Sequence, residues 1–169
     1  MEKYKVLFCD LDGTLIDTIS GATFPKGVWD MKLKFDILDS IKALAPEYVF
    51  IVTNQGGIEK GFVDESDFSD KLDYVMASVG EYCNINWLKR GWNYCPSNDK
   101  HDKDRKPNIG MLEELWKDGT ECACEKSDCL MIGDASGLEG QFSDSDKKTA
   151  ENFGIDYMDV SEFVEQYKI

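Results

Sequence analysis

The run Phe8-Cys9-Asp10-Leu11-Asp12-Gly13-Thr14 decides both the fold and the chemistry that this chain can support. It continues Tyr4-Lys5-Val6-Leu7-Phe8, an apolar stretch typical of a strand buried on both faces of a parallel sheet. Such a strand delivers two carboxylates to its carboxyl end, where open α/β sheets bind their ligands. Adjacent carboxylates repel one another unless a cation or a shared proton lies between them. We therefore interpret Asp10 and Asp12 as a catalytic, metal-binding pair rather than as two solvated acids in a turn.

The rest of the chain alternates predicted strands and helices, which indicates an α/β three-layer sandwich with a mainly parallel sheet. With 169 residues and no repeat or linker, we expect a single domain over residues 1–169. The pattern predicts further strands at 48–52, 92–95, 129–132 and 155–157, and helices near 34–45, at about 65–83, from Pro107 onward, around 150–153 and at 160–167.

Two further predicted strands also end in polar residues, Thr53 and Asp134. Because the carboxyl ends of parallel strands share one edge, we expect these side chains to converge with Asp10 and Asp12. Lys106 adds a cation at the start of a predicted helix. Taken singly, Thr53 would be an ordinary hydroxyl at a strand end and Lys106 an exposed lysine at a helix start, but together the set matches phosphoryl transfer. Metal and lysine offset the phosphate charge, the hydroxyl fixes an oxygen, and a carboxylate attacks.

Four segments resemble, in order, the four motifs of the haloacid dehalogenase (HAD) superfamily: Asp10-Leu11-Asp12-Gly13-Thr14, Thr53-Asn54-Gln55, Lys106 and Gly133-Asp134. The resemblance covers nearly the whole chain and implies a HAD-like Rossmannoid fold with phosphatase activity. It implies that Asp10 is the nucleophile that forms an aspartyl-phosphate, and that Asp12 protonates the leaving group and then activates water. Thr53, Asn54 and Lys106 would hold the phosphate.

The same resemblance implies that Mg²⁺ is the cofactor. Its ligands would be the Asp10 carboxylate, the Asp12 backbone carbonyl and Asp134, and Asp146 would support the metal or its waters. Zinc is the alternative metal, because relatives in the histidinol and heptose bisphosphate phosphatase group carry a zinc loop before the lysine motif. Here that pattern is incomplete, so we expect free thiols and a surface histidine instead. The residues concerned are Cys95, His101, Cys122, Cys124 and Cys129.

The connections between motifs are short, with roughly 40 residues between Thr14 and Thr53 and about 50 between Thr53 and Lys106. They leave no room for a large cap domain, so we expect a minimal cap and an open cleft that suits a phosphate on a bulky substrate. Residues 17–25 and 133–146 resemble polynucleotide 3′-phosphatases, although Gln141 stands where that subgroup often has an acid. No Gly-x-x-x-x-Gly-Lys-Ser/Thr loop is present, so the kinase half of bifunctional relatives is not expected.

We therefore expect a stand-alone phosphatase for polynucleotide 3′-phosphate ends, with a histidinol-phosphate or heptose-bisphosphate phosphatase as the alternative. A receiver-like signalling module is the non-enzyme alternative, but receivers place the acceptor aspartate on a later strand. Given the net charge of −14, broad adhesion to nucleic acid or to an anionic membrane is not expected, and any polyanion would be gripped locally. We expect no obligate protein partner. Because the sequence starts without an apolar export signal, we expect a cytoplasmic protein.

Overall fold

The computed structural model describes residues 4–169, so the start of the chain at Met1–Lys3, used above to argue against an export signal, lies outside the described residues. The strands are β1 (Val6–Cys9), β2 (Ile16–Asp17), β3 (Lys32–Leu33), β4 (Tyr48–Asn54), β5 (Arg90–Cys95), β6 (Cys129–Gly133) and β7 (Asp156–Asp159). The α-helices are α1 (Phe35–Leu44), α2 (Gly56–Glu59), α3 (Glu65–Tyr82), α4 (Gly110–Glu114), α5 (Ser145–Phe153) and α6 (Val160–Gln166). Short turns of other helix types are η1 (Trp87–Lys89), η2 (Leu115–Gly119) and η3 (Lys126–Asp128).

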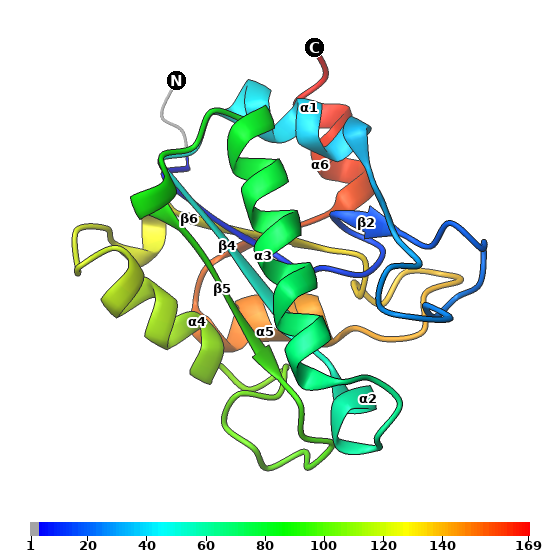
Figure 1. Ribbon diagram of the computed structural model, residues 1–169. Helices are drawn as coiled ribbons and strands as arrows, with labels where there is room; N and C mark the ends of the chain where they lie inside the picture. The colour runs from blue at the N-terminus through cyan, green and yellow to red at the C-terminus, as the bar shows by residue number, and fades with distance from the viewer. Residues whose placement is uncertain (1–3) are drawn as a thin grey trace.

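Five strands form one sheet in the order β5-β4-β1-β6-β7, and every neighbouring pair is parallel (Figure 1). The motif-bearing strand β1 lies in the centre, where Phe8 is in register with Phe50 of β4 and with Met131 of β6. The predicted parallel sheet is therefore confirmed.

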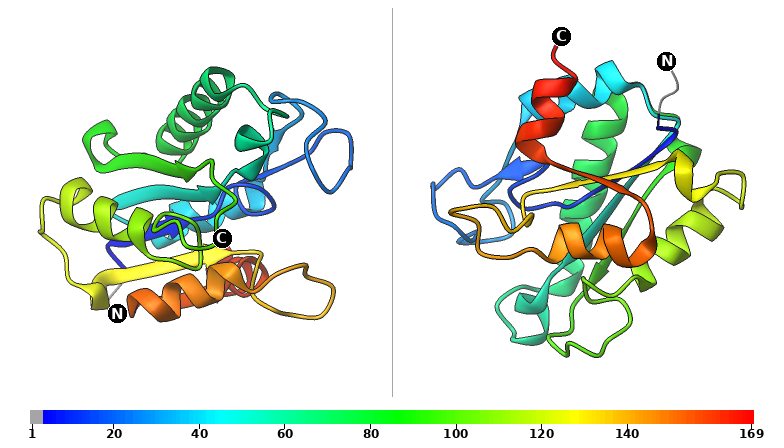
Figure 2. Two further views of the ribbon diagram at one scale, coloured as in Figure 1. Left: turned by 90° about the horizontal axis from the view of Figure 1, so that it is seen from below. Right: turned by 180° about the vertical axis from the view of Figure 1, so that it is seen from behind.

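Helices cover both faces of this sheet, because alternate residues of each strand point to opposite sides. Leu7 and Cys9 pack on the side of α1, α3 and α6, whereas Val6 and Phe8 pack on the side of α4 and α5. Figure 1 shows α3 crossing in front of the strands, and the view from behind in Figure 2 shows α5 on the opposite face. Burial on both faces explains why β1 is apolar at every position, and the predicted three-layer sandwich is confirmed.

The chain leaves β1, β4, β5 and β6 at the same edge of the sheet, and the four motifs lie at the ends of these strands or in the loops that follow them, with Lys106 in the loop after β5. Between β1 and α1 the regular structure consists of the short antiparallel pair β2–β3. Within residues 4–169, no helix combines the length and the apolar character needed to cross a membrane.

The helix expected from Pro107 begins later than the sequence predicts. Residues 103–110 form turns, in which Asn108 N–H donates to the Arg105 carbonyl and Gly110 N–H donates to the Lys103 carbonyl, each at 2.8 Å. Helix α4 then starts at Gly110 and continues as η2. The prediction that Pro107 occupies the first helical turn is therefore wrong, because local hydrogen bonds hold this segment as a loop.

Replacing Phe8 tests how much the core between the sheet and α5 contributes to the stability of the protein. Its ring is fully buried and lies 5.7 Å from the Phe50 ring and 6.3 Å from the Phe153 ring, measured between centroids. Phe8→Ala should lower the free energy of unfolding by about 3–5 kcal/mol because it leaves a cavity. In urea denaturation, the matched control Phe24→Ala, whose ring is exposed, should stay within about 0.5 kcal/mol of the wild type. Equal losses in both variants would contradict this account of the core.

Candidate active site

The ammonium group of Lys106 lies at the centre of the site. It donates to Asp10 Oδ1 at 2.8 Å, to Asp146 Oδ1 at 2.6 Å and to the Val52 carbonyl at 3.0 Å. With 4% of its surface exposed, Lys106 is a buried residue and not a lysine on the surface of a helix start. Burial alone would lower its pKa, but Asp10 and Asp146 outweigh burial and raise it, so the group carries a positive charge.

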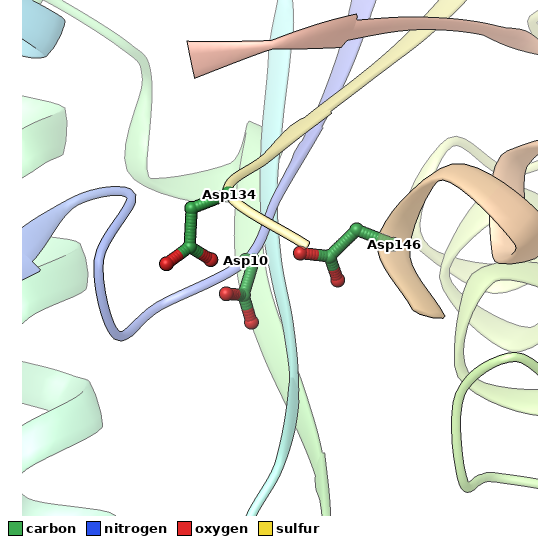
Figure 3. A group of neighbouring side chains, drawn as sticks. All are labelled: Asp10, Asp134 and Asp146. Carbon is green, nitrogen blue, oxygen red and sulfur yellow. The ribbon is translucent and has the colours of Figure 1, made fainter. Parts of the chain in front are cut away.

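Three carboxylates meet beside this lysine. Asp10 follows β1, Asp134 follows β6 and Asp146 lies in the first turn of α5, and one oxygen from each lies within 4.8 Å of the others. Figure 3 shows Asp10 between the other two. Burial is the main cause that raises the pKa of Asp10 and of Asp146 to about 6 each, against the lowering effect of Lys106. Burial, followed by the Asp146 charge, also raises the pKa of Asp134. The group therefore carries more negative charge than one lysine neutralises.

A hard divalent cation fits this donor set. Mg²⁺ takes oxygen ligands and is commonly held by one or two carboxylates together with substrate phosphate and water. Both oxygens of Asp146 already have partners, since Oδ1 accepts from Lys106 and Oδ2 accepts from the Ala135 N–H at 3.1 Å. The geometry thus favours Asp10 and Asp134 as direct ligands and gives Asp146 the task of holding Lys106.

Hydrogen bonds through the side chain of Gln55 connect Asp12 to Thr53. The amide of Gln55 donates to Asp12 Oδ2 and to Thr53 Oγ1, both at 2.9 Å. Thr53 itself is 1% exposed. The structure thus brings together the two residues predicted for proton transfer and phosphate binding, and it adds a connection that the sequence analysis missed. The only signal for it was the position of Gln55 within the Thr53-Asn54-Gln55 motif.

Asn54 has a partner other than the phosphate expected for it. Its Oδ1 accepts from the Lys106 N–H at 2.9 Å, and its Nδ2 donates to the Lys106 carbonyl at 3.0 Å. The side chain of Asn54 therefore fixes the backbone of Lys106 through two hydrogen bonds. A contact between Asn54 and phosphate stays a prediction.

Two glycines lack the Cβ atom that would otherwise collide with carboxylates of the site. Gly13 has a φ of +79°, and a Cβ there would lie 2.0 Å from Asp134 Oδ2. A Cβ on Gly133 would lie 2.4 Å from Asp146 Oδ2. The two motif glycines thus permit close packing of backbone against two acids of the site.

Gln141, which departs from the pattern of polynucleotide 3′-phosphatases, fixes the loop after Asp134. Its Oε1 accepts from the N–H of Ser136 at 2.8 Å, and its Nε2 donates to Asp159 Oδ2 at 2.7 Å. A carboxylate could accept the first bond but could not donate the second. An amide is therefore the side chain that suits both neighbours.

The residues of the incomplete zinc pattern differ in their surroundings. His101 and Cys122 are exposed, whereas Cys95, Cys124 and Cys129 are buried in the core beside α4 and α5. The acidic group at Lys106 is the one set of three potential metal ligands that the structure brings together within residues 4–169.

The chain is similar to several known proteins. Residues 5–164 match the family described as polynucleotide kinase 3 phosphatase. A 20.8 kDa protein of the FGF-VUBI intergenic region of Autographa californica nuclear polyhedrosis virus is 30% identical over 97% of this chain and 87% of its own length. The bifunctional polynucleotide phosphatase/kinase of Schizosaccharomyces pombe is 31% identical over 94% of this chain but only 37% of its own length. The D-glycero-D-manno-heptose-1,7-bisphosphate 7-phosphatase of Chlorobaculum tepidum is 31% identical over 79% of this chain and 71% of its own length.

A solved structure shares the fold. The D,D-heptose 1,7-bisphosphate phosphatase of B. bronchiseptica, complexed with magnesium and phosphate, superimposes with a TM-score of 0.64 over 96% of this chain and 97% of that chain, at 19% identity. The fold and the relatives together define a HAD-type phosphatase, which confirms the enzymatic interpretation over the receiver-like one. More narrowly, the chain belongs to the polynucleotide kinase 3 phosphatase family.

The clearance at Gly13 gives a test with a matched control. Gly13→Ala and Gly21→Ala place a Cβ on backbones with nearly the same positive φ, but the space around Gly21 is empty. Both variants pay the backbone strain, whereas only Gly13→Ala displaces Asp134. We expect Gly13→Ala to lose at least about tenfold in phosphate release from 4-nitrophenyl phosphate, equivalent to about 1.4 kcal/mol. Gly21→Ala should retain the wild-type rate. Equal rates in the two variants would show that the position of Asp134 does not limit the reaction.

Proposed function

We propose that this protein is a Mg²⁺-dependent phosphomonoesterase that acts through an aspartyl-phosphate, with the 3′-phosphate end of a polynucleotide as its substrate. The observation that carries the reaction is the buried Lys106 ammonium between Asp10 and Asp146, with Asp134 beside them. A nucleophilic carboxylate, a fixed cation and an oxygen-rich cation site thus lie at one edge of the sheet.

The reaction proceeds in two steps. An oxygen of Asp10 attacks phosphorus, the bond from phosphorus to the ester oxygen breaks, and Asp12 gives its proton to the departing oxygen. Water then attacks the phosphorus of the aspartyl-phosphate, Asp12 takes a proton from that water, and inorganic phosphate leaves as the Asp10 carboxylate is restored. Lys106 and Thr53 hold the oxygens of the transferred group, and Gln55 orients Asp12 through the hydrogen bond of 2.9 Å.

Mg²⁺ bound by Asp10 and Asp134 would offset the charge of the phosphate. The backbone carbonyl of Asp12 is proposed as its third protein ligand. Asp146 supports the site by fixing Lys106.

Exposed aromatic rings favour a polynucleotide end as the substrate. Phe24, Phe62 and Phe142 are exposed by 70%, 80% and 75%. They lie in the β2–β3, α2–α3 and β6–α5 loops, within the connections that lead from β1, β4 and β6 to the next long helix. The loop that carries Phe24 is attached to α3 through the rings of Trp29 and Tyr74, whose centroids are 5.8 Å apart. Nucleic-acid bases stack on such rings with roughly 1–3 kcal/mol per base, independently of sequence. A sugar phosphate would leave these rings unused.

A heptose-bisphosphate phosphatase is the second candidate, because the relative from Chlorobaculum tepidum matches this chain over 79% of its length. The two candidates differ in the leaving group, since one carries stacked bases and the other a polar sugar.

Replacing the nucleophile tests the reaction. Asp10→Asn should lower phosphate release with Mg²⁺ to background, because an amide does not form the phosphoryl intermediate. Asp17→Asn removes an exposed carboxylate a few residues away and should keep the wild-type rate. Phosphate release at the wild-type rate by Asp10→Asn would disprove the assignment of the nucleophile, as would a trapped phosphoryl group on another residue.

Replacing the exposed rings tests the substrate. Phe24→Ala, Phe62→Ala and Phe142→Ala should each lower kcat/KM for a 3′-phosphorylated oligonucleotide by roughly fivefold or more, as the loss of about 1 kcal/mol of stacking requires. None should change kcat/KM for 4-nitrophenyl phosphate. Trp87→Ala, which removes an exposed ring from η1 at the opposite end of β5, is the control and should have no effect on either substrate. Wild-type preference for heptose 1,7-bisphosphate over the oligonucleotide would favour the second candidate.

A further inference from the structure

A second buried lysine, Lys71 of α3, has no role in the reaction described above. Its residue surface is 3% exposed, much like that of Lys106. Lys106 donates three hydrogen bonds, whereas the Lys71 ammonium makes neither a hydrogen bond nor an ion pair within 4 Å among the described residues. The contact recorded for it is the face of the Phe68 ring, whose centroid lies 5.9 Å away.

Lys71 lies on the part of α3 that packs beside the carboxyl ends of the strands. Phe68, one turn earlier on the same helix face, packs its ring on Tyr94 at 5.3 Å between centroids. Tyr94 of β5 is in register with Thr53 of β4, so this part of α3 lies level with the carboxyl ends of the strands. Burial lowers the pKa of Lys71, and the negative charges of Asp12 and then of Asp30 act in the opposite direction. Lys71 thus lies on the helix that covers one face of the sheet near the carboxyl ends of the strands, whereas Lys106 is bonded to Asp146 of α5, which covers the opposite face.

Both neighbouring carboxylates have other partners. Asp30 accepts from the N–H and the hydroxyl of Ser20, at 2.9 and 2.6 Å, and from the Lys26 N–H at 2.9 Å. Asp12 accepts from Gln55. The two acids thus provide a favourable field for the ammonium without occupying its donors.

The Lys71 nitrogen is not completely enclosed by the protein. Of the residues from 4 to 169, Thr14 contributes the one side-chain polar atom that is both inaccessible and without a hydrogen-bond partner, so the Lys71 nitrogen retains contact with solvent. Burying an ammonium group without a hydrogen-bond partner destabilises the folded protein. An apolar side chain at the same helix position would avoid this cost. A ligand that supplies the missing acceptor explains a lysine here.

We propose that Lys71 binds a second phosphate of the substrate, located in the leaving group on the Asp12 side of the ester bond. The inference rests on the proposed function, in which Asp12 protonates the leaving oxygen and Lys106 holds the transferred phosphoryl group. Two buried lysines, one on α3 and one bonded to α5 on the opposite face of the sheet, then receive two phosphates of one substrate. In a protein with a net charge of −14, the overall charge does not attract a phosphate, so attraction has to come from individual cations in the site.

The second phosphate has two chemical sources. In a polynucleotide 3′ end it is the phosphodiester on the 5′ side of the terminal nucleotide, and in a sugar bisphosphate it is the distal phosphomonoester. The same lysine would serve both, so the substrates must be tested in pairs. Thymidine 3′-monophosphate is paired with the 3′-phosphorylated dinucleotide, and 4-nitrophenyl phosphate provides a substrate without a second phosphate. Heptose 1,7-bisphosphate is paired with heptose 7-phosphate.

The variant is Lys71→Met, which keeps the apolar stem beside Phe68 and removes the charge. It should lower kcat/KM for the two-phosphate member of the pair that the enzyme uses by about tenfold to a hundredfold, as expected for a hydrogen bond between charged groups. Single-phosphate substrates should be unaffected, and Lys71→Arg should recover part of the loss. Lys60→Met, which removes an exposed lysine and changes the net charge equally, should leave both substrates unchanged. The Tm of Lys71→Met should not fall below that of the wild type.

Two results would overturn the inference. A loss of equal size for single-phosphate and two-phosphate substrates would show that Lys71 acts through Asp12, and no loss for either would show that it is structural. Failure of the proposed function is a different result, since the wild type would then release phosphate from none of the substrates. In that case the affinity for thymidine 3′,5′-bisphosphate decides, because binding needs no turnover. It should fall in Lys71→Met and not in Lys60→Met, and equal affinities would refute the inference.

Discussion

The three hydrogen bonds of the Lys106 ammonium are the interaction on which the rest of the site depends. They join the loop after β1, through Asp10, to helix α5, through Asp146, and to strand β4, through the Val52 carbonyl. Removing one partner of a buried ion pair typically costs about 3–5 kcal/mol, because the remaining charge is left without compensation. The lysine therefore holds three segments that are far apart in the sequence and keeps two buried carboxylates next to each other.

The parallel sheet brings these segments to one edge, and glycines allow the backbone to approach the carboxylates closely. Neighbouring parallel strands end at one edge, so the residues after β1 and β6 start only one strand spacing apart. At that distance a Cβ on Gly13 or on Gly133 would overlap a carboxylate of the site. The glycines of the first and fourth motifs thus allow the backbone to pack against the acids, and Gly13, with its φ of +79°, also permits the turn after Asp12.

The sheet and the convergence of the motifs could be predicted because both follow from local rules. Strands buried on two faces are apolar throughout, and parallel strands place their ends together. The partners of Gln55 and Asn54 could not be predicted, since an amide donates and accepts in any direction and its orientation depends on tertiary contacts. Lys71 was missed for a related reason. Helix periodicity includes position 71 in the buried face of α3, but a lysine within an apolar pattern is assigned to solvent.

The distribution of charge suits recognition of a strand end rather than of a long duplex. The net charge is −14, and the only two arginines donate to backbone carbonyls, Arg90 to Met76 and Ala77 and Arg105 to Ser97. Long-range attraction of a polyanion is thus absent, and salt screens charges beyond about 8 Å in any case. Under the proposed function, binding then depends on the two buried lysines at contact distance and on stacking of bases on the exposed rings. A ligand gains from this arrangement only over the few groups that enter the site, so affinity should depend on the end of the chain and little on its length.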